Sequence, residues 1–357
     1  MARLALTYDD IQLVPSFSSV KSRTRISLHT QLSERYWLLN PIVASPMDTV
    51  CEEEMAYKMF LSGGVGCIHR FLSVEEQAAQ VRRLYQRIFG DGFGAPYTDW
   101  MVRASELGLG NTMPPIMAAI GVMATDMQRA KALTEAGANV LLIDVAHGDH
   151  QNVIDMIKWC KENLDPSVDI IAGNIATAES AERLQEAGAD GLRVGIGGGS
   201  LCTTRIKTGF GVPNVTSLLD VASVAKVPVM ADGGLRTSGD IAKALAIGAH
   251  NVMLGSLLSG TAETPGNVIE KNGSLYKRYR GSASLETKTA HGQEQRNVEG
   301  ESTVIPFKGG VKFVIEGLLD GVKSALSYAG ADSLDKYSPD YVQVTNSGIR
   351  EAQPHLL

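Results

Sequence analysis

The sequence contains few cysteines and no metal-ligand pattern. Its four cysteines are Cys51, Cys67, Cys160 and Cys202, and no two of them form a CxxC pair. This spacing argues against both a disulfide framework and a structural zinc site. We therefore expect free thiols, as in a cytoplasmic protein.

Long apolar runs and an excess of basic residues are also missing. No stretch approaches the roughly 18 uninterrupted apolar residues of a membrane span, and the N-terminus "MARLALTYDD" lacks the apolar core of a signal peptide. The 33 Lys and Arg residues against 39 Asp and Glu leave a net charge of -6. Nucleic acids and anionic membranes need a basic surface, so small molecules are the expected partners.

Short apolar runs recur along the 357 residues. Three of them follow a helix end marked by glycine, the typical αβ junction of a repeating unit, at 135–144, 186–195 and 246–255. Five more lie at 41–48, 63–69, 115–122, 169–177 and 227–234. Because amphipathic stretches separate the eight runs, the sequence predicts an α/β fold, a single (β/α)8 TIM barrel over residues 1–357.

Two segments do not fit the repeat. Residues 71–113 form a long connection after the second predicted strand. Residues 261–312 follow the eighth and are polar and glycine-rich. Long insertions on the working face of a barrel are usually lids, so we expect 261–312 to be an active-site flap.

A glycine-rich loop follows the sixth predicted strand, with the sequence "VGIGGGSLCTTRIKTGFG" at 194–211, and is called the cysteine loop below. Its Cys202 could be a nucleophile, a metal ligand or a small packed side chain. Glycine amides can bind anions or stabilise a thiolate, and a barrel's active site lies on the loops that follow its strands. This position favours the nucleophile.

The loops after the seventh and eighth strands carry "ADGG" (231–234) and "LGS" (254–256). Either could be only a tight turn, but backbone N–H groups near Gly255 and Ser256 would form a phosphate cradle. Asp232 ends an apolar strand and needs a polar partner, which ribose hydroxyls would supply. The sequence "AHGDH" (146–150) could hold a metal, although a strand-end loop that touches ligand is the preferred interpretation.

Together these motifs resemble a known family. The combination of "SPMDTV", "AGNIAT", "GIGGGSLCTTRIKTGFG", "ADGGLRTSGDIAKAL", "VMLGSLLSG", "YKRYRGSAS" and "VIPFKG" resembles the IMP dehydrogenase and GMP reductase family across nearly the whole chain. Within it, "CTTR" followed by "KTGFG" is similar to the reductase pattern. The segment from Gly281 to Glu299 has no Arg-Tyr pair, which dehydrogenases use to activate water.

Two further features bear on the choice between a reductase and a dehydrogenase. The 43 residues from 71 to 113 are too few for the tandem regulatory module of most dehydrogenases, although some reductases carry it and some dehydrogenases lack it. The motif "ASPMDTV" is more like the dehydrogenase form than "ANMDTV".

The resemblance implies reductive deamination of GMP to IMP with NADPH as hydride donor. It gives Cys202 the role of nucleophile at purine C2 and makes Thr204 and Glu299 an acid-base relay for the leaving ammonia. From the residues alone, Glu299 could be a solvated carboxylate and Thr204 a turn cap.

The resemblance also implies binding residues, a homotetramer and a monovalent cation, K+. The substrate residues would be Ser45, Met47, Ser200, Asp232, Gly233, Gly234, Gly255, Ser256, Tyr279, Gly281, Ser282 and Arg296. The cofactor residues would be Asp144, Val145, Ala146, Asn174, Gly195, Ile196 and Gly197, with Ser324 and Tyr328 from the same chain or from a neighbouring subunit. The backbone carbonyls of Gly197, Gly199, Cys202 and Arg205 would hold the cation.

Three alternatives stay open. One is an IMP dehydrogenase without the regulatory domain, which converts IMP, NAD and water to XMP. Another is an FMN-binding barrel oxidoreductase, since "ADGG" and "LGS" also suit the FMN phosphate. The third is a catalytically silent nucleotide-binding relative, which the presence of Cys202, Thr204 and Glu299 together disfavours.

Overall fold

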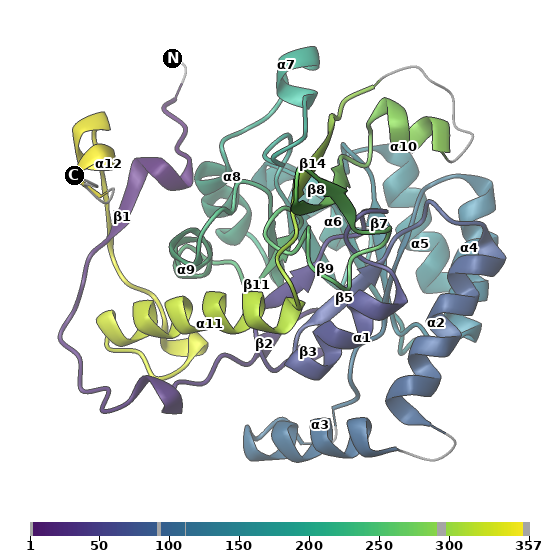
Figure 1. Ribbon diagram of the computed structural model, residues 1–357, viewed down its shortest axis with the longest axis horizontal. Coiled ribbons are helices and arrows are strands. Elements are labelled where there is room, and N and C mark those ends of the chain that lie inside the picture. Colours follow the sequence, from purple (N-terminus) through teal and green to yellow (C-terminus); the bar gives the residue numbers. More distant parts are fainter. Residues whose placement is uncertain (1–2, 91–93, 111, 291–297, 353–357) are drawn as a thin grey trace.

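The structure, a computed structural model, describes residues 3–90, 94–110, 112–290 and 298–352. Eight parallel strands form a closed barrel, and β11 pairs with β4 to complete it (Figure 1). In chain order they are β4 (Ile42–Ala44), β5 (Val65–Ile68), β6 (Met117–Ile120), β7 (Val140–Asp144), β8 (Asp169–Ile175), β9 (Gly191–Val194), β10 (Val229–Asp232) and β11 (Asn251–Leu254). The predicted TIM barrel is confirmed, with a strand in each of the eight apolar runs.

Both faces of the barrel strands are buried, which explains why their sequences are apolar without interruption. In β7, Val140 and Leu142 belong to the core inside the barrel. Leu141 and Ile143 belong to the larger core between the barrel and its helices. Alternate residues of one strand therefore supply two cores.

Helices surround the barrel. Those that follow the first seven strands are α1 (Glu53–Ser62), α2 (Val74–Phe89), α4 (Ala124–Glu135), α5 (Gln151–Asn163), α6 (Ala178–Glu186), α8 (Asn214–Ala222) and α9 (Ser238–Ala246). The last, α11 (Val311–Tyr328), packs against α9 and α1 and closes the ring. None of the helices in the described ranges is long and apolar enough to cross a membrane.

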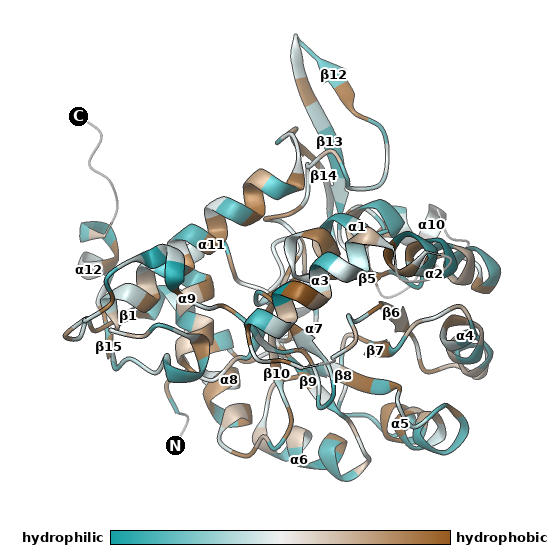
Figure 2. Cartoon of the chain, turned by 90° about the horizontal axis from the view of Figure 1, so that it is seen from below, coloured by the Kyte–Doolittle hydropathy of each residue, from teal (hydrophilic) through white to brown (hydrophobic). Residues whose placement is uncertain are grey.

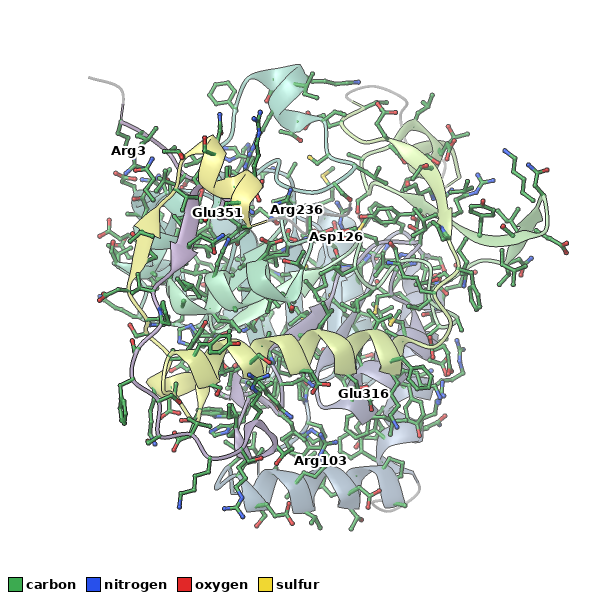
Figure 3. The ribbon with its side chains drawn as sticks, turned by 60° about the vertical axis from the view of Figure 1, so that its left-hand side comes forward. Arg3, Arg103, Asp126, Arg236, Glu316 and Glu351 are labelled. Atoms are coloured by element: carbon green, nitrogen blue, oxygen red, sulfur yellow. The ribbon has the colours of Figure 1, made fainter. Side chains whose placement is uncertain are left out.

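The connection at 71–113 contains α2 and a further helix, α3 (Ala95–Glu106). Trp100 and Ala104 of α3 are buried, and Arg103 donates to the Leu61 carbonyl at 3.2 Å. Figure 3 labels Arg103 on α3, at the opposite end of the molecule from the short helix α7 (Thr204–Thr208). The described part of this connection contains no tandem regulatory domain.

The predicted flap segment contains a three-stranded antiparallel sheet and a helix: β12 (Ile269–Lys271), β13 (Ser274–Arg280), α10 (Leu285–Ala290) and β14 (Ser302–Pro306). The β12–β13 hairpin projects from the barrel (Figure 2).

The remaining elements lie outside the barrel. Near the N-terminus, β1 (Ile11–Leu13) pairs with β15 (Tyr341–Gln343), and β2 (Thr30–Gln31) pairs with β3 (Trp37–Leu38). The helix α12 (Asn346–Glu351) follows β15, and short 3-10 turns span Tyr8–Asp10, Arg23–Arg25 and Leu334–Lys336.

Candidate active site

A cavity of about 420 Å³ lies at the carboxyl ends of the barrel strands. Most of the predicted site residues line it: Ser45, Met47, Asp144, Val145, Ala146, Asn174, Gly195, Gly197, Gly199, Ser200, Cys202, Thr204, Asp232, Gly233, Gly234, Gly255, Ser256, Tyr279, Gly281, Ser282 and Glu299. They come from the loops after six of the eight strands and from the predicted flap segment. Closure of the barrel brings these distant loops to one place.

Three of these side chains form a hydrogen-bonded row. The Cys202 thiol donates to Thr204 Oγ1 at 3.1 Å, and the Thr204 hydroxyl donates to Glu299 Oε2 at 2.6 Å. Thr204 is buried, whereas Cys202 is half-buried and lines the cavity. The row can therefore move a proton between a carboxylate and the open side of the cavity.

Backbone hydrogen bonds hold Glu299 at this place, although it lies 95 residues from Thr204. The Thr203 N–H donates to the Glu299 carbonyl at 2.9 Å, and the Glu299 N–H donates to the Ala283 carbonyl at 3.0 Å. The Glu301 N–H donates to the Leu201 carbonyl at 3.0 Å. Residues 299–301 thus lie between the cysteine loop and the residues that follow β13.

Arg205 shapes the glycine-rich half of the cysteine loop from behind. Its Nε donates to the Ile196 carbonyl at 2.9 Å, and Nη2 donates to the Val212 carbonyl at 2.8 Å. Gly197 has a φ of 72°, and a Cβ there would lie 2.5 Å from Arg205 Cγ. Glycine is needed at this position both for its conformation and for the close approach.

Asp232 ends β10 beside the cavity and is held on several sides. Asn174 Nδ2 donates to Asp232 Oδ2 at 2.7 Å, and Asn214 Nδ2 donates to the carbonyls of Asp232 at 3.0 Å and of Gly233 at 2.6 Å. A Cβ on Gly233 would come within 2.8 Å of the Gly198 backbone, so the turn after β10 packs directly on the cysteine loop.

Arg193 of β9 bridges two carboxylates. Its guanidinium donates from Nε to Asp232 Oδ2 at 3.0 Å and contacts Asp144 Oδ1, while only 8% of its side chain is exposed. Burial alone would lower the pKa of this guanidinium, but Asp232 and Asp144 outweigh that effect and the pKa is raised. Arg193 therefore stays charged and fixes both carboxylates.

Replacing Arg193 by methionine should destabilise the protein by about 3 kcal/mol, because two largely buried carboxylates would lose their counter-charge. Thermal unfolding would show this as a Tm lowered by several degrees. The matched control is Arg3→Met, since the Arg3 side chain lies on the surface (Figure 3), where it is 62% exposed and pairs with Asp220. An unchanged Tm for Arg193→Met would contradict the prediction.

Two hydroxyl groups and a glycine backbone meet at one corner of the cavity. Ser200 Oγ and Tyr279 OH lie 3.1 Å apart, and Tyr279 is buried. Burial raises the pKa of the Tyr279 phenol, which therefore stays a neutral hydrogen-bond donor. A Cβ on Gly255 would lie 3.1 Å from Met47 Sδ and 3.3 Å from Tyr279 OH, so the bare backbone of Gly255 faces this corner.

Some predicted residues lie elsewhere. Ile196 and Arg205 belong to the cysteine loop, where Arg205 Nε donates to the Ile196 carbonyl, but they do not line the cavity. Ser324 and Tyr328 lie on α11, outside the cavity of their own chain, where Arg23 donates to Ser324 Oγ at 2.9 Å and stacks over the Tyr328 ring. Arg296 is outside the described residues.

The four residues predicted to hold a cation through their carbonyls lie within one loop, between Gly197 and Arg205. Two of those carbonyls already accept backbone hydrogen bonds. The Gly199 carbonyl accepts from the Cys202 N–H and the Arg205 carbonyl from the Gly209 N–H, both at 3.1 Å. A carbonyl can accept two partners, so these bonds are compatible with a cation ligand, and the cation stays a prediction.

In the motif at 146–150, Ala146 lines the cavity, whereas Asp149 and His150 have structural roles. Asp149 accepts from Ser180 Oγ at 2.9 Å and pairs with Arg183, and His150 Nδ1 accepts from the Asn152 N–H at the start of α5. The described part of the chain shows no group of three or more His, Cys, Asp or Glu side chains that could hold a metal ion.

Sequence reasoning missed Arg193, Arg70 and Asn214. Arg70 lines the cavity and its Nε lies 3.6 Å from Asp144 Oδ2. A signal for Arg193 was present, since it is a charged residue inside the otherwise apolar run "GLRVG". Asn214 gave none, because its role depends on the position of Asp232 and Gly233 in space.

Comparison with known proteins places the chain in a family. A protein-family model described as "IMP dehydrogenase / GMP reductase domain" matches residues 5–355. The chain belongs to this family. The family resemblance stated from the sequence motifs is therefore confirmed, and the protein is an oxidoreductase of purine nucleotide metabolism.

Relatives of both kinds are similar to it. The GMP reductase of Leishmania donovani is 34% identical, with 98% of this chain and 96% of the relative covered. The inosine-5'-monophosphate dehydrogenase of Cryptosporidium parvum is 38% identical, with 98% and 94% covered. The reductase aligns over 474 residues, more than the 357 of this chain, so it carries segments that this chain lacks.

A solved structure has the same fold. A cysteine-to-alanine variant of the GMP reductase from Trypanosoma brucei, in complex with guanosine 5'-monophosphate, superimposes with a TM-score of 0.88 at 33% identity. The superposition covers 100% of this chain and 98% of the Trypanosoma brucei chain.

Proposed function

We propose that the protein is a GMP reductase that converts GMP, NADPH and two protons to IMP, NADP+ and ammonium. The observation that carries the proposal is the row from Cys202 through Thr204 to Glu299, with separations of 3.1 and 2.6 Å. Reductive deamination needs a nucleophile and an acid for the leaving amine, and this row supplies both at one edge of the cavity.

Cys202 would act as a thiolate after its proton passes to Thr204 and Glu299. The sulfur attacks purine C2, the bond from C2 to the exocyclic nitrogen breaks, and the relay returns the proton so that ammonia leaves. NADPH supplies the hydride that C2 then accepts. The sulfur–carbon bond then breaks, which forms IMP and restores the Cys202 thiolate.

The lining residues suit a purine nucleotide on one side of the cavity. Asp232, fixed by Arg193 and Asn174, offers carboxylate oxygens to ribose hydroxyls. The glycine turns and the neutral hydroxyls of Ser200 and Tyr279 offer donors to a phosphate. The purine would lie near Ser45 and Met47, with Gly281 and Ser282 at its edge. The Trypanosoma brucei reductase crystallised with guanosine 5'-monophosphate supports this ligand.

The part of the cavity at the ends of β7 and β8 suits a dinucleotide. Asp144, Val145, Ala146 and Asn174 line it, and Arg70 adds a positive charge that an anionic cofactor group would meet. NADPH as donor, K+ at the cysteine loop and a homotetramer remain predictions. The roles of Ser324 and Tyr328 would require a second copy, because both lie outside the cavity of their own chain.

The alternative is IMP dehydrogenase, since a relative with that activity is equally similar. A dehydrogenase must hydrolyse its covalent adduct with activated water. The 281–299 segment has no Arg-Tyr pair for this step, whereas Glu299 and Thr204 already contact the cysteine loop. This difference favours the reductase.

Two reactions on one preparation test the choice. We expect GMP to drive NADPH oxidation with one ammonia released per NADPH, and IMP with NAD to give little or no sustained XMP. Ammonia assay and chromatography of the nucleotides measure both. Sustained XMP formation without ammonia from GMP would show a dehydrogenase instead. Flavin absorbance in the purified protein would favour the FMN-binding alternative.

A further inference from the structure

The turn after β11 presents backbone donors at the cavity. Gly255 and Ser256 line the cavity, and the Ser259 N–H donates to the Gly255 carbonyl at 2.9 Å. Within the described residues, no hydrogen bond of this turn uses the N–H groups of Ser256, Leu257 or Leu258 as donors. Free N–H groups at the start of such a turn can bind an anion.

A lysine controls the orientation of these peptides from the outer side. Lys308 Nζ donates to the Ser256 carbonyl at 2.9 Å and to the Leu257 carbonyl at 3.0 Å. The C=O and N–H of one trans peptide point in opposite directions. Holding both carbonyls at the ammonium therefore turns the N–H groups of Leu257 and Leu258 away from it.

The rest of the segment is anchored without Lys308. Lys277 is 2% exposed and donates to the carbonyls of Ala262 at 3.3 Å and of Thr264. Glu263 Oε2 accepts from the Val311 N–H at the start of α11 at 2.8 Å. Removing the Lys308 ammonium would thus leave the Leu257 carbonyl without this donor, while the Ser256 carbonyl keeps only its bond from Ser259 Oγ at 2.7 Å.

We propose that Lys308 is a positioning residue for the 5'-phosphate of the nucleotide. It fixes the two peptides that directly follow Gly255 and Ser256, the residues of this turn that line the cavity, and places a positive charge behind the turn. The inference rests on the proposed function, because that function supplies the phosphate. The lysine acts through the turn and does not touch the substrate.

The test separates phosphate binding from binding of the nucleoside. In Lys308→Met, we expect the Kd for GMP to rise roughly tenfold, since two hydrogen bonds from a charged group are lost. The Ki of guanosine, measured as a competitor of GMP, should stay unchanged because guanosine has no phosphate. Lys308→Arg should restore most of the GMP affinity.

The control is Lys312→Met, which also removes one positive charge, in this case from α11. The Lys312 side chain is 72% exposed and pairs with Glu316 at 3.7 Å. In calorimetric titration, the Lys312→Met variant should bind GMP with the same affinity as the unmodified protein. An unchanged GMP affinity in Lys308→Met, or an equal loss for GMP and guanosine, would overturn the inference. An unmodified protein that binds neither GMP nor IMP would instead refute the proposed function.

Discussion

Replacement of Cys202 by alanine should lower the turnover of GMP by about 10⁴-fold or more, because the reaction loses its nucleophile and no other cysteine of the described residues lines the cavity. GMP binding should be nearly unchanged, since the predicted phosphate and ribose contacts come from other loops. Steady-state assay of NADPH oxidation and calorimetric titration with GMP measure the two properties separately.

Cys160→Ala is the matched control for this experiment. Cys160 is buried on α5 and does not line the cavity. We expect near-normal turnover in that variant. Turnover close to that of the unmodified protein in Cys202→Ala would remove the nucleophile from the proposal, whereas loss of GMP binding would show that the cysteine shapes the nucleotide site.

Replacement of Glu299 by glutamine should slow the release of ammonia by about 100-fold to 10,000-fold, the usual effect of losing a positioned acid-base group. Thr204→Ala should act in the same direction, because its hydroxyl links Cys202 to Glu299. Hydride transfer should be affected much less. Mixing IMP with NADP+ isolates that step, since nicotinamide reduction can then be followed in the absence of ammonia.

Glu301→Gln is the matched control for the relay. Glu301 is exposed and its backbone, not its side chain, bonds to the cysteine loop through the Leu201 carbonyl. We expect the Glu301→Gln variant to keep normal rates of ammonia release and of hydride transfer. If Glu299→Gln slowed ammonia release and hydride transfer equally, or slowed neither, the relay would be wrong and Glu299 would act only in the packing of the segment.

The strands and the cysteine loop could be predicted because their signals are local. A barrel strand buried on both faces must be apolar along its whole length, so each of the eight was visible as a run. The close approach of Arg205 requires glycine at 197, and the loop therefore carries its own sequence signature. The predicted flap segment was found by its length and polarity, but its three-stranded sheet was not predicted.

Other parts of the site depend on distances across the fold. Strand β9 places Arg193 between Asp232 of the adjacent β10 and Asp144 of β7, which lies beyond β8, and no spacing along the chain encodes that bridge. The Asn214 contacts and the Lys308 ammonium behind the turn after β11 arise in the same way.

The sequence by itself determined the barrel, because a strand buried on both faces must be apolar along its length. Its motifs resemble the family, and that resemblance implied most of the residues that line the cavity. The resemblance implied that Glu299 acts with Thr204. Only the tertiary structure decided that their side chains form one hydrogen-bonded row with Cys202, since 95 residues separate Glu299 from Thr204. Tertiary structure also decided that Ser324 and Tyr328 lie outside the cavity of their own chain. Hydrogen bonds and ion pairs act over a few ångströms, so closure of the barrel sets which of them form.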